Sequence, residues 1–327
     1  ALVQSGDFDG GLEQLETARE MAPEAPQILA ALVEAHIANG DIETAKAVAS
    51  AYSERLPQDP QSEIYLARIA IQENDLESAR SHFGEAEGRL RRVIADQPDN
   101  PILQTLLVDT LVGQGKLDEA ATVLEELPDE FASEPAVLVA RGRIALAANR
   151  PAVAEPLLQS ALERNPNSMT ALWLSGAYKS QGRSDEAVDL LKDWLETNPA
   201  DVLVRSELAS TLLQFGRDQE ARDQYQDLAD RGPENFIVLN NLAWLLREED
   251  PQQALVHIER ASELAPANAQ ILDTYAMVQL EAGNVEEALA LNQQALDQFP
   301  DEFSLRFNRA TILQADGQTD QAISILE

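Results

Sequence analysis

The sequence predicts an all-α fold, a right-handed superhelical solenoid built from antiparallel pairs of helices. Two observations carry this prediction. First, 44% of the 327 residues are hydrophobic but only 5% are aromatic, and Ala and Leu dominate, which favours helices over sheets. Second, a small residue recurs every 33 or 34 residues along the chain, with one longer interval of 41. A period of this length is typical of stacked two-helix units, each of which needs its neighbours to complete its core.

The recurring small residue marks ten successive units. It is Gly11, Ala45, Ala79, Ala120, Ala154, Ala187, Ala221, Ala254, Ala288 and Ala322. A proline keeps the same pace, at Pro23, Pro57, Pro98, Pro166, Pro199, Pro233, Pro266 and Pro300. The shared period indicates one structural motif repeated along the whole chain.

Each unit is predicted to hold two helices. The first carries apolar residues at helical spacing, for example Leu272, Tyr275 and Ala276. It ends at a residue that accepts the left-handed backbone conformation closing a helix. These ends are Gly40, Gly115, Asn149, Gly182, Gly216, Gly283 and Gly317. The second helix presents the recurring small residue where two helices approach closely, and it stops before the proline.

This pattern resembles the tetratricopeptide repeat over the whole chain. The resemblance includes a small residue in the first helix, at Ala67, Gly142, Ser175, Ala209, Ala243, Ala276 and Ala310. It implies a single solenoid over residues 1–327 with about ten units. The first unit, residues 1–25, and the last, residues 303–327, are expected to be incomplete, as in a piece cut from a longer array.

The single interval of 41 residues lies between Ala79 and Ala120. Its seven extra residues correspond to about two helical turns, so we expect a second helix that is extended around residues 86–100. Arg89, Arg91 and Arg92 form a basic spot in this segment. The spot is either a docking point for a partner or a solvated helix end.

The charge of the chain excludes several classes of partner. Fifty-seven acidic residues face twenty-four basic ones, for a net charge of −33. Such a polyanion is repelled by nucleic-acid backbones and by anionic membrane surfaces, which leaves proteins or peptides as the expected partners. No apolar run is long enough to cross a bilayer.

The sequence offers no catalytic, metal-binding or cofactor-binding pattern. There is no cysteine for a nucleophile, a thiolate metal site or a disulfide. Gly115 and Lys116 lack the spacing of a phosphate-binding loop, and Leu117 stands where that loop needs Ser or Thr. His36, His82 and His257 lie in different units. We therefore expect no enzyme, no metal and no cofactor.

The segment Leu239–Leu246 is the strongest candidate for a binding surface. Its core stripe leaves Asn240, Asn241 and Trp244 facing away from the core. The resemblance implies that first helices line a concave groove where ligands bind. Side-chain amides can bond a peptide backbone, and an exposed indole can anchor it. Alternatively, the asparagines are solvated and Trp244 packs on the adjoining helix.

The residue after each small first-helix position forms a ladder along the expected groove. Its first four members, Glu34, Arg68, Asp109 and Arg143, alternate in charge and are expected to neutralise one another between units. The later members are small, apolar or neutral. The candidate groove contacts are Trp173, Lys179, Ser210, Asn240, Asn241, Trp244, Met277, Phe307 and Asn308.

A narrower resemblance covers Leu239–Leu291, which is similar to the last units of the tetratricopeptide lipoproteins associated with exosortase and PEP-CTERM sorting. It departs from them at Tyr275, Ala276 and Met277, where that family commonly has Leu-Gly-Trp. The resemblance implies a lipid-anchored scaffold in the bacterial periplasm or on the periplasmic face of the outer membrane. Its role would be in exopolysaccharide export or protein sorting.

Two other functions stay open from the sequence. One is a cytoplasmic adaptor or co-chaperone. The family's clamp for C-terminal carboxylates needs converging bases, and Lys179 is the one groove lysine, while Arg68 and Arg143 have acidic neighbours. An adaptor that uses this clamp is therefore disfavoured. The other is a regulatory repeat domain attached to an enzyme that lies outside this sequence.

Overall fold

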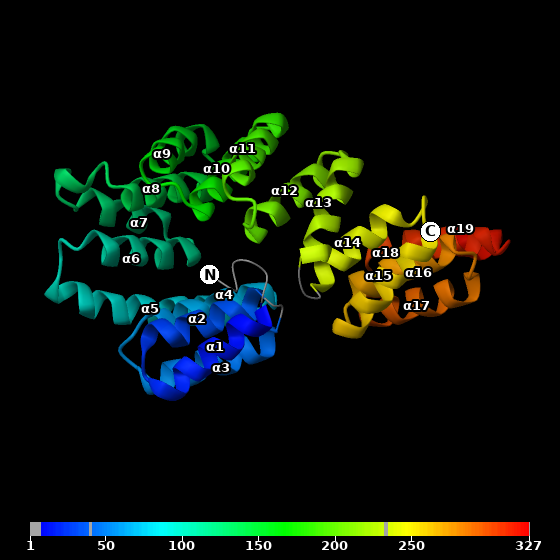
Figure 1. Cartoon of the computed structure of the whole chain (residues 1–327), viewed down its shortest axis with the longest axis horizontal. Coiled ribbons are helices and arrows are strands. Elements are labelled where there is room, and N and C mark those ends of the chain that lie inside the picture. The colour runs from blue at the N-terminus through cyan, green and yellow to red at the C-terminus, as the bar shows by residue number, and fades with distance from the viewer. Residues whose placement is uncertain (1–7, 39–40, 232–234, 327) are drawn as a thin grey trace. The chain divides into compact units, whose positions relative to one another are not determined.

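The computed structural model describes residues 8–38, 41–231 and 235–326. Over these residues the chain forms nineteen α-helices, one short 3₁₀-helix and no strand, which confirms the all-α prediction (Figure 1). Two residues of the predicted pattern, Gly40 and Pro233, lie outside the described residues.

The helices follow the predicted two-per-unit order. Their bounds are α1 (Phe8–Met21), α2 (Pro26–Ala38), α3 (Ile42–Arg55), α4 (Gln61–Gln72), α5 (Leu76–Asp96), α6 (Pro101–Gly113), α7 (Leu117–Glu125), α8 (Pro135–Ala147), α9 (Pro151–Arg164), α10 (Ser168–Ser180), α11 (Ser184–Thr197), α12 (Val202–Gln214), α13 (Asp218–Arg231), α14 (Phe236–Leu246), α15 (Pro251–Leu264), α16 (Ala269–Glu281), α17 (Val285–Gln298), α18 (Phe303–Ala315) and α19 (Thr319–Leu326). The 3₁₀-helix η2 (Asp129–Phe131) follows α7.

The helices belong to two compact units, Ala1–Thr211 and Leu212–Glu327. In the first unit α2 packs on α3, α4 on α5, α8 on α9 and α10 on α11. In the second, α14 packs on α15, α16 on α17 and α18 on α19. First helices of neighbouring repeats also touch, since α14 contacts α16 and α16 contacts α18.

The helix ends have local causes that are visible in the sequence. The Oδ1 atoms of Asn100, Asn235 and Asn268 accept hydrogen bonds from the first backbone N–H groups of α6, α14 and α16. The predicted left-handed ends are confirmed at Gly115, Asn149, Gly182, Gly216, Gly283 and Gly317. Asn74 takes the same conformation, with a φ of 59°, and ends the turn after α4.

The recurring small residue lies at a close contact between helices. Ala45, Ala120, Ala187, Ala221 and Ala288 are all completely buried. The small position of the first helix is equally tight. A Cβ atom on Gly142 of α8 would lie 2.7 Å from Cγ of Leu158 on α9. Larger side chains are excluded here because they would force the paired helices apart.

The helix that contains Ala79 is longer than its counterparts. α5 has 21 residues, whereas α3, α9, α11, α13, α15 and α17 have 14 each. Arg89, in the second half of α5, is not a surface charge, because only 11% of its side chain is exposed. Arg91 pairs with Glu87 and Glu119, and Arg92 is exposed.

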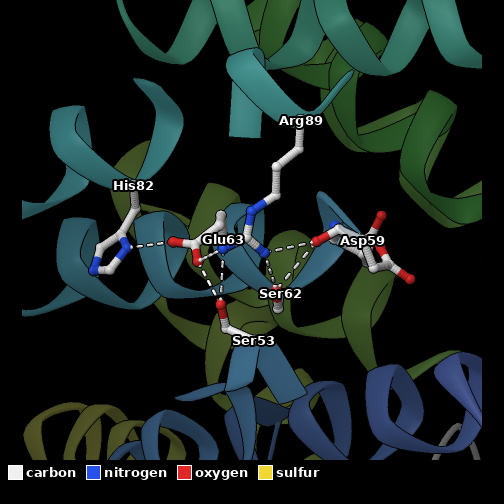
Figure 2. A network of polar contacts seen from close by, with 7 residues as sticks. Ser53, Asp59, Ser62, Glu63, His82 and Arg89 are labelled. Atoms are coloured by element: carbon white, nitrogen blue, oxygen red, sulfur yellow. Dashed lines mark hydrogen bonds and ion pairs between the residues drawn. The ribbon is translucent and has the colours of Figure 1, made fainter. Parts of the chain in front are cut away.

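Arg89 joins three segments of the chain through one buried polar network (Figure 2). Its Nη2 donates to Oε1 of Glu63 at 2.6 Å and to Oγ of Ser53 at 3.0 Å. Its Nη1 donates to the carbonyl oxygen of Asp59 at 2.9 Å. The other oxygen of Glu63 lies 2.7 Å from Nδ1 of His82. For Arg89 both interpretations from the sequence, a docking point and a solvated helix end, are therefore wrong, because its guanidinium is buried and holds α5 against the α3–α4 turn.

Candidate functional site

The unit formed by Leu212–Glu327 contains a hollow of about 780 Å³. It is lined mainly by the first helices of three successive repeats, α14, α16 and α18, and by the turns that lead into the last two, with Leu213 of α12 and Gln298 at the end of α17. Its lining residues are Leu213, Asn240, Asn241, Trp244, Ala267, Asn268, Ala269, Gln270, Asp273, Thr274, Gln298, Phe299, Glu302, Ser304 and Leu305.

Polar residues that line this hollow occupy equivalent positions in neighbouring repeats. In α14 the residues Val238, Leu242, Ala243 and Leu246 are buried in the core. Helical spacing then turns Asn240, Asn241 and Trp244 toward the hollow. Asn240 precedes Ala243 by three positions, and Asp273 precedes Ala276 by the same three. Asn240 and Asp273 therefore occupy one repeat position on neighbouring helices.

The two asparagines of α14 have different environments. Asn241 donates from Nδ2 to the hydroxyl of Tyr225 at 2.9 Å. Asn240 donates from Nδ2 to Oδ1 of Asn241 at 3.4 Å, a long hydrogen bond. Asn240 is only 6% exposed, and its Oδ1 is buried without a hydrogen-bond partner. A buried acceptor in this state costs on the order of 1–3 kcal/mol until a donor reaches it.

Asp273 supplies the carboxylate of the hollow. Its Oδ2 accepts from Nδ2 of Asn308 at 2.7 Å, and its Oδ1 accepts from Nδ2 of Asn292 at 3.4 Å. Burial raises the pKa of Asp273 above its ordinary value, and the two amide hydrogen bonds offset only part of that rise. The carboxylate is thus held in place by neutral donors.

Two aromatic side chains, Trp244 and Phe299, form another part of the wall. Trp244 is half-buried and packs against the core cluster of α16 and α17. The guanidinium of Arg247 lies 3.8 Å from the centre of its ring and also pairs with Glu248. Phe299 lines the hollow and is 55% exposed. Trp244 therefore combines both roles considered from the sequence, because it packs on the adjoining helix and also borders the hollow.

The predicted groove residues separate into three groups. Asn240, Asn241 and Trp244 line the hollow. Asn308 donates a hydrogen bond to Asp273, which also lines it. Met277 is only 8% exposed and belongs to the core, so it departs from the expected groove position. Asn240, too, is more deeply buried than its position off the core stripe suggested.

The other candidates lie elsewhere. Phe307 is exposed on α18 and stacks on Phe303 with ring centres 6.2 Å apart. Ser210 is exposed on α12. Trp173 and Lys179 lie in the unit Ala1–Thr211. Trp173 is covered by the guanidinium of Arg143 at 4.8 Å, and Lys179 pairs with Glu207.

The charge ladder is partly as predicted. Arg143 forms an ion pair with Asp109 of the preceding repeat, which confirms neutralisation at that step. At the first step of the ladder, Glu34 and Arg68 are linked through a tyrosine. The hydroxyl of Tyr65 donates to Oε1 of Glu34 at 2.8 Å, and Arg68 lies 6.0 Å from the centre of the Tyr65 ring.

Asp273 and Phe299 belong to the site but are not among the residues predicted from the sequence. The repeat pattern could have identified Asp273, because it occupies the repeat position of Asn240 one unit later. Among the described residues, no group of three His, Asp or Glu side chains is arranged to hold a metal ion. Nor does any helix in that part of the chain have both the length and the apolarity needed to span a bilayer.

Comparisons with known proteins identify the repeat. A family model described as the tetratricopeptide repeat matches residues 2–63, 79–144, 145–206, 180–243, 245–306 and 279–327. No curated protein matches this chain.

Comparison with solved structures gives matches at low sequence identity. The structure of the APC/C hetero-tetramer Cut9–Hcn1 is 13% identical, with a TM-score of 0.53 over 96% of this chain and 77% of that one. A structure of MamA is 16% identical, with a TM-score of 0.41 over 47% of this chain and 90% of that one. MamA from Desulfovibrio magneticus RS-1 is 18% identical, with a TM-score of 0.43 over 48% and 89%. Because the family model covers most of its length, this chain belongs to the tetratricopeptide repeat family.

Proposed function

We propose that this chain is a non-catalytic scaffold that binds an extended segment of a partner protein in the hollow between α14, α16 and α18. The tetratricopeptide repeat fold is consistent with protein–protein interaction. The observation that carries the proposal is the buried Oδ1 of Asn240, an acceptor without a partner in the wall of the hollow. A peptide backbone offers N–H donors at regular intervals and would satisfy this acceptor.

The dimensions and the lining of the hollow suit such a ligand. Its volume of about 780 Å³ falls in the range of pockets that enclose a compact ligand group, roughly 300–1,000 Å³. Trp244 and Phe299 provide apolar area, and Asn240, Asn241 and Asp273 provide polar contacts. This combination of an apolar anchor with a few placed polar groups is the usual composition of a peptide-binding site.

Selection from a random linear peptide library displayed on phage tests the proposal, with the chain immobilised. The wild-type chain should enrich peptides that the double variant Asn241→Ala/Trp244→Ala does not retain. Arg68→Ala is the matched control, because Arg68 contacts Tyr65 in the other unit and should leave the enrichment unchanged.

A second variant serves as a control in case the double variant does not fold. Ser304 is exposed at the rim of the hollow, so Ser304→Trp should fill the space without removing a core contact. Both variants should abolish the enrichment. Equal enrichment by the wild type and by Ser304→Trp would show that the hollow is not the binding site.

The cellular setting is proposed on the narrower resemblance alone. The similarity of Leu239–Leu291 to exosortase-associated lipoproteins supports a role in the bacterial envelope, in exopolysaccharide export or PEP-CTERM protein sorting. Fractionation of the native cells, with detection by an antibody against this chain, should then place it with the periplasmic or outer-membrane fraction. A cytosolic location would favour the adaptor, or the regulatory domain of a larger enzyme, instead.

A further inference from the structure

The ionisable residues that line the hollow between α14, α16 and α18 are all of one sign. Two ionisable residues line it, Asp273 and Glu302, and both are acidic. None of its lining residues is Lys, Arg or His. The nearby guanidinium of Arg247 is on the ring of Trp244 and is paired with Glu248, so it does not supply a counter-charge to Asp273.

Asp273 has different partners from three partly or fully buried carboxylates of the unit Ala1–Thr211. Glu63 is paired with Arg89, Glu87 with Lys116 and Arg91, and Asp109 with Arg143. Asp273 has only the amides of Asn308 and Asn292 as donors, and among the described residues no cation lies within ion-pair distance of it. A carboxylate has about four acceptor positions, so two neutral donors leave capacity for a further partner. Burying a carboxylate without a cation is costly, and such groups cluster at functional sites.

Asn240 provides a second, independent acceptor in the same wall. Its Oδ1 is buried and unpartnered, and it occupies the repeat position of Asp273 on the neighbouring helix. Two acceptors with open capacity require a ligand that brings several donors. Arg and Lys side chains carry five and three N–H donors and no acceptor.

The aromatic wall suits the same ligand. An Arg or Lys stem can lie on an aromatic ring while its charged end reaches a carboxylate. This chain uses that contact internally, with Arg143 on Trp173 at 4.8 Å, Arg183 on Tyr178 at 4.6 Å and Arg247 on Trp244 at 3.8 Å. In the hollow, Phe299 and the part of Trp244 that lines it are available for a cation from outside.

We infer that the partner segment carries an arginine or lysine side chain, which enters the hollow and pairs with the carboxylate of Asp273. This inference rests on the proposed function. Arginine is the preferred residue, because its planar guanidinium can donate to a carboxylate and to an amide oxygen at the same time. The net charge of −33 would speed the encounter with such a segment.

The phage selection separates this inference from the proposed function. Peptides that are retained by the wild type and lost with Ser304→Trp support the proposed function, whatever their sequence. Among them, an Arg or Lys at one fixed position supports the inference. Retained peptides that lack a basic residue, or are acidic, overturn the inference and leave the proposed function standing.

A double-variant experiment then tests the contact itself. Fluorescence anisotropy gives the Kd of the most enriched peptide and of its analogue with Gln at the basic position, for the wild type and Asp273→Asn. The Arg or Lys peptide should bind Asp273→Asn at least tenfold more weakly than wild type, whereas the Gln analogue should bind both proteins equally. Glu281→Gln, which removes an exposed charge from the same helix, should change neither Kd by more than about twofold. Equal losses for both peptides on Asp273→Asn would overturn the pairing.

Discussion

Nδ2 of Asn308 in α18 donates a hydrogen bond to Oδ2 of Asp273 in α16 at 2.7 Å, across two neighbouring repeats. Asn292 of α17 bonds the other carboxylate oxygen and also the carbonyl oxygen of Leu305 in α18. Asp273 is thus oriented from two elements, both of which use amides rather than charges. Such an arrangement fixes the position of the carboxylate and leaves its charge uncompensated.

The first prediction concerns the cost of that charge. Because burial raises the pKa of Asp273, the native state holds this proton to higher pH than the unfolded chain does. Native stability is therefore lost as the pH rises through the interval between the two pKa values. Asp273→Asn removes the charge, and rotation of the Asn308 amide can restore its hydrogen bond. Its Tm should exceed that of the wild type at pH 7, and the difference should shrink as the pH is lowered toward 4. A variant less stable at every pH would mean that the hydrogen bonds outweigh the charge.

The second prediction concerns Glu87 of α5. Burial opposes its ionisation, but hydrogen bonds from Lys116, Arg91 and Gln114 outweigh burial and lower its pKa to about 2. The resulting stability is fully present above the ordinary pKa of 4.5 and is lost as the pH falls from there toward 2. Glu87→Gln should cost roughly 1–2 kcal/mol at pH 7, since its basic partners are partly screened by solvent. Urea denaturation at pH 7 and pH 3 measures this, and the difference from wild type should be smaller at pH 3.

Glu85→Gln is the control for this measurement. Glu85 is exposed on the same helix, and its substitution should change stability by less than about 0.5 kcal/mol at either pH. If Glu85→Gln and Glu87→Gln had equal effects, the loss would reflect net charge and not the hydrogen bonds to the α6–α7 turn.

The third prediction concerns Arg89 and the network of Figure 2. Arg89→Ala leaves Glu63, which is 5% exposed, without its guanidinium partner, and should cost about 3 kcal/mol. Arg92→Ala, at an exposed position of the same helix, should stay within about 0.5 kcal/mol of wild type. Chemical denaturation gives both values. The double variant Glu63→Gln/Arg89→Met should lose less stability than the sum of its single variants, because the pair acts as one unit. Additive losses would argue against a coupled pair.

The fourth prediction concerns the recurring alanine. Ala221→Leu and Ala288→Leu should each lower stability by about 1–3 kcal/mol, because both alanines are completely buried between helices. Ala290→Leu places the same side chain at an exposed position of α17 and should be nearly neutral. Thermal unfolding followed by circular dichroism distinguishes these outcomes. If the buried and the exposed substitutions melted alike, the recurring alanine would not mark a close helix contact.

Local chemistry explains why so much of the fold could be predicted. The glycine or asparagine after first helices and the helix-stopping prolines depend on backbone conformations within a few residues of each other, and the period of the small residue repeats this local pattern along the chain. The structure confirms them at Gly115, Asn149 and Gly283, which have positive φ, and at Ala221 and Ala288, which are buried. The face on which Asn241 and Trp244 lie also follows from helical spacing alone.

Partners of long side chains could not be predicted in the same way. Arg89 stands in a basic run, yet its side chain reaches Glu63 and Ser53 in the preceding helices. Met277 occupies the same repeat position as Trp244, one unit later. It lies in the core, because neighbouring helices cover it.

The amino-acid pattern alone is enough to predict the repeat, the order of the helices and the helix that contributes the two asparagines and the indole. It takes the packing of separate helices to bring Asp273 against Asn308 and Asn292, and to leave Oδ1 of Asn240 buried without a donor. The two kinds of feature differ in the distance along the chain over which they are set. Backbone conformation and side-chain direction are set within a turn or two of helix, whereas a partner is set by the packing of separate helices to within a hydrogen-bond length.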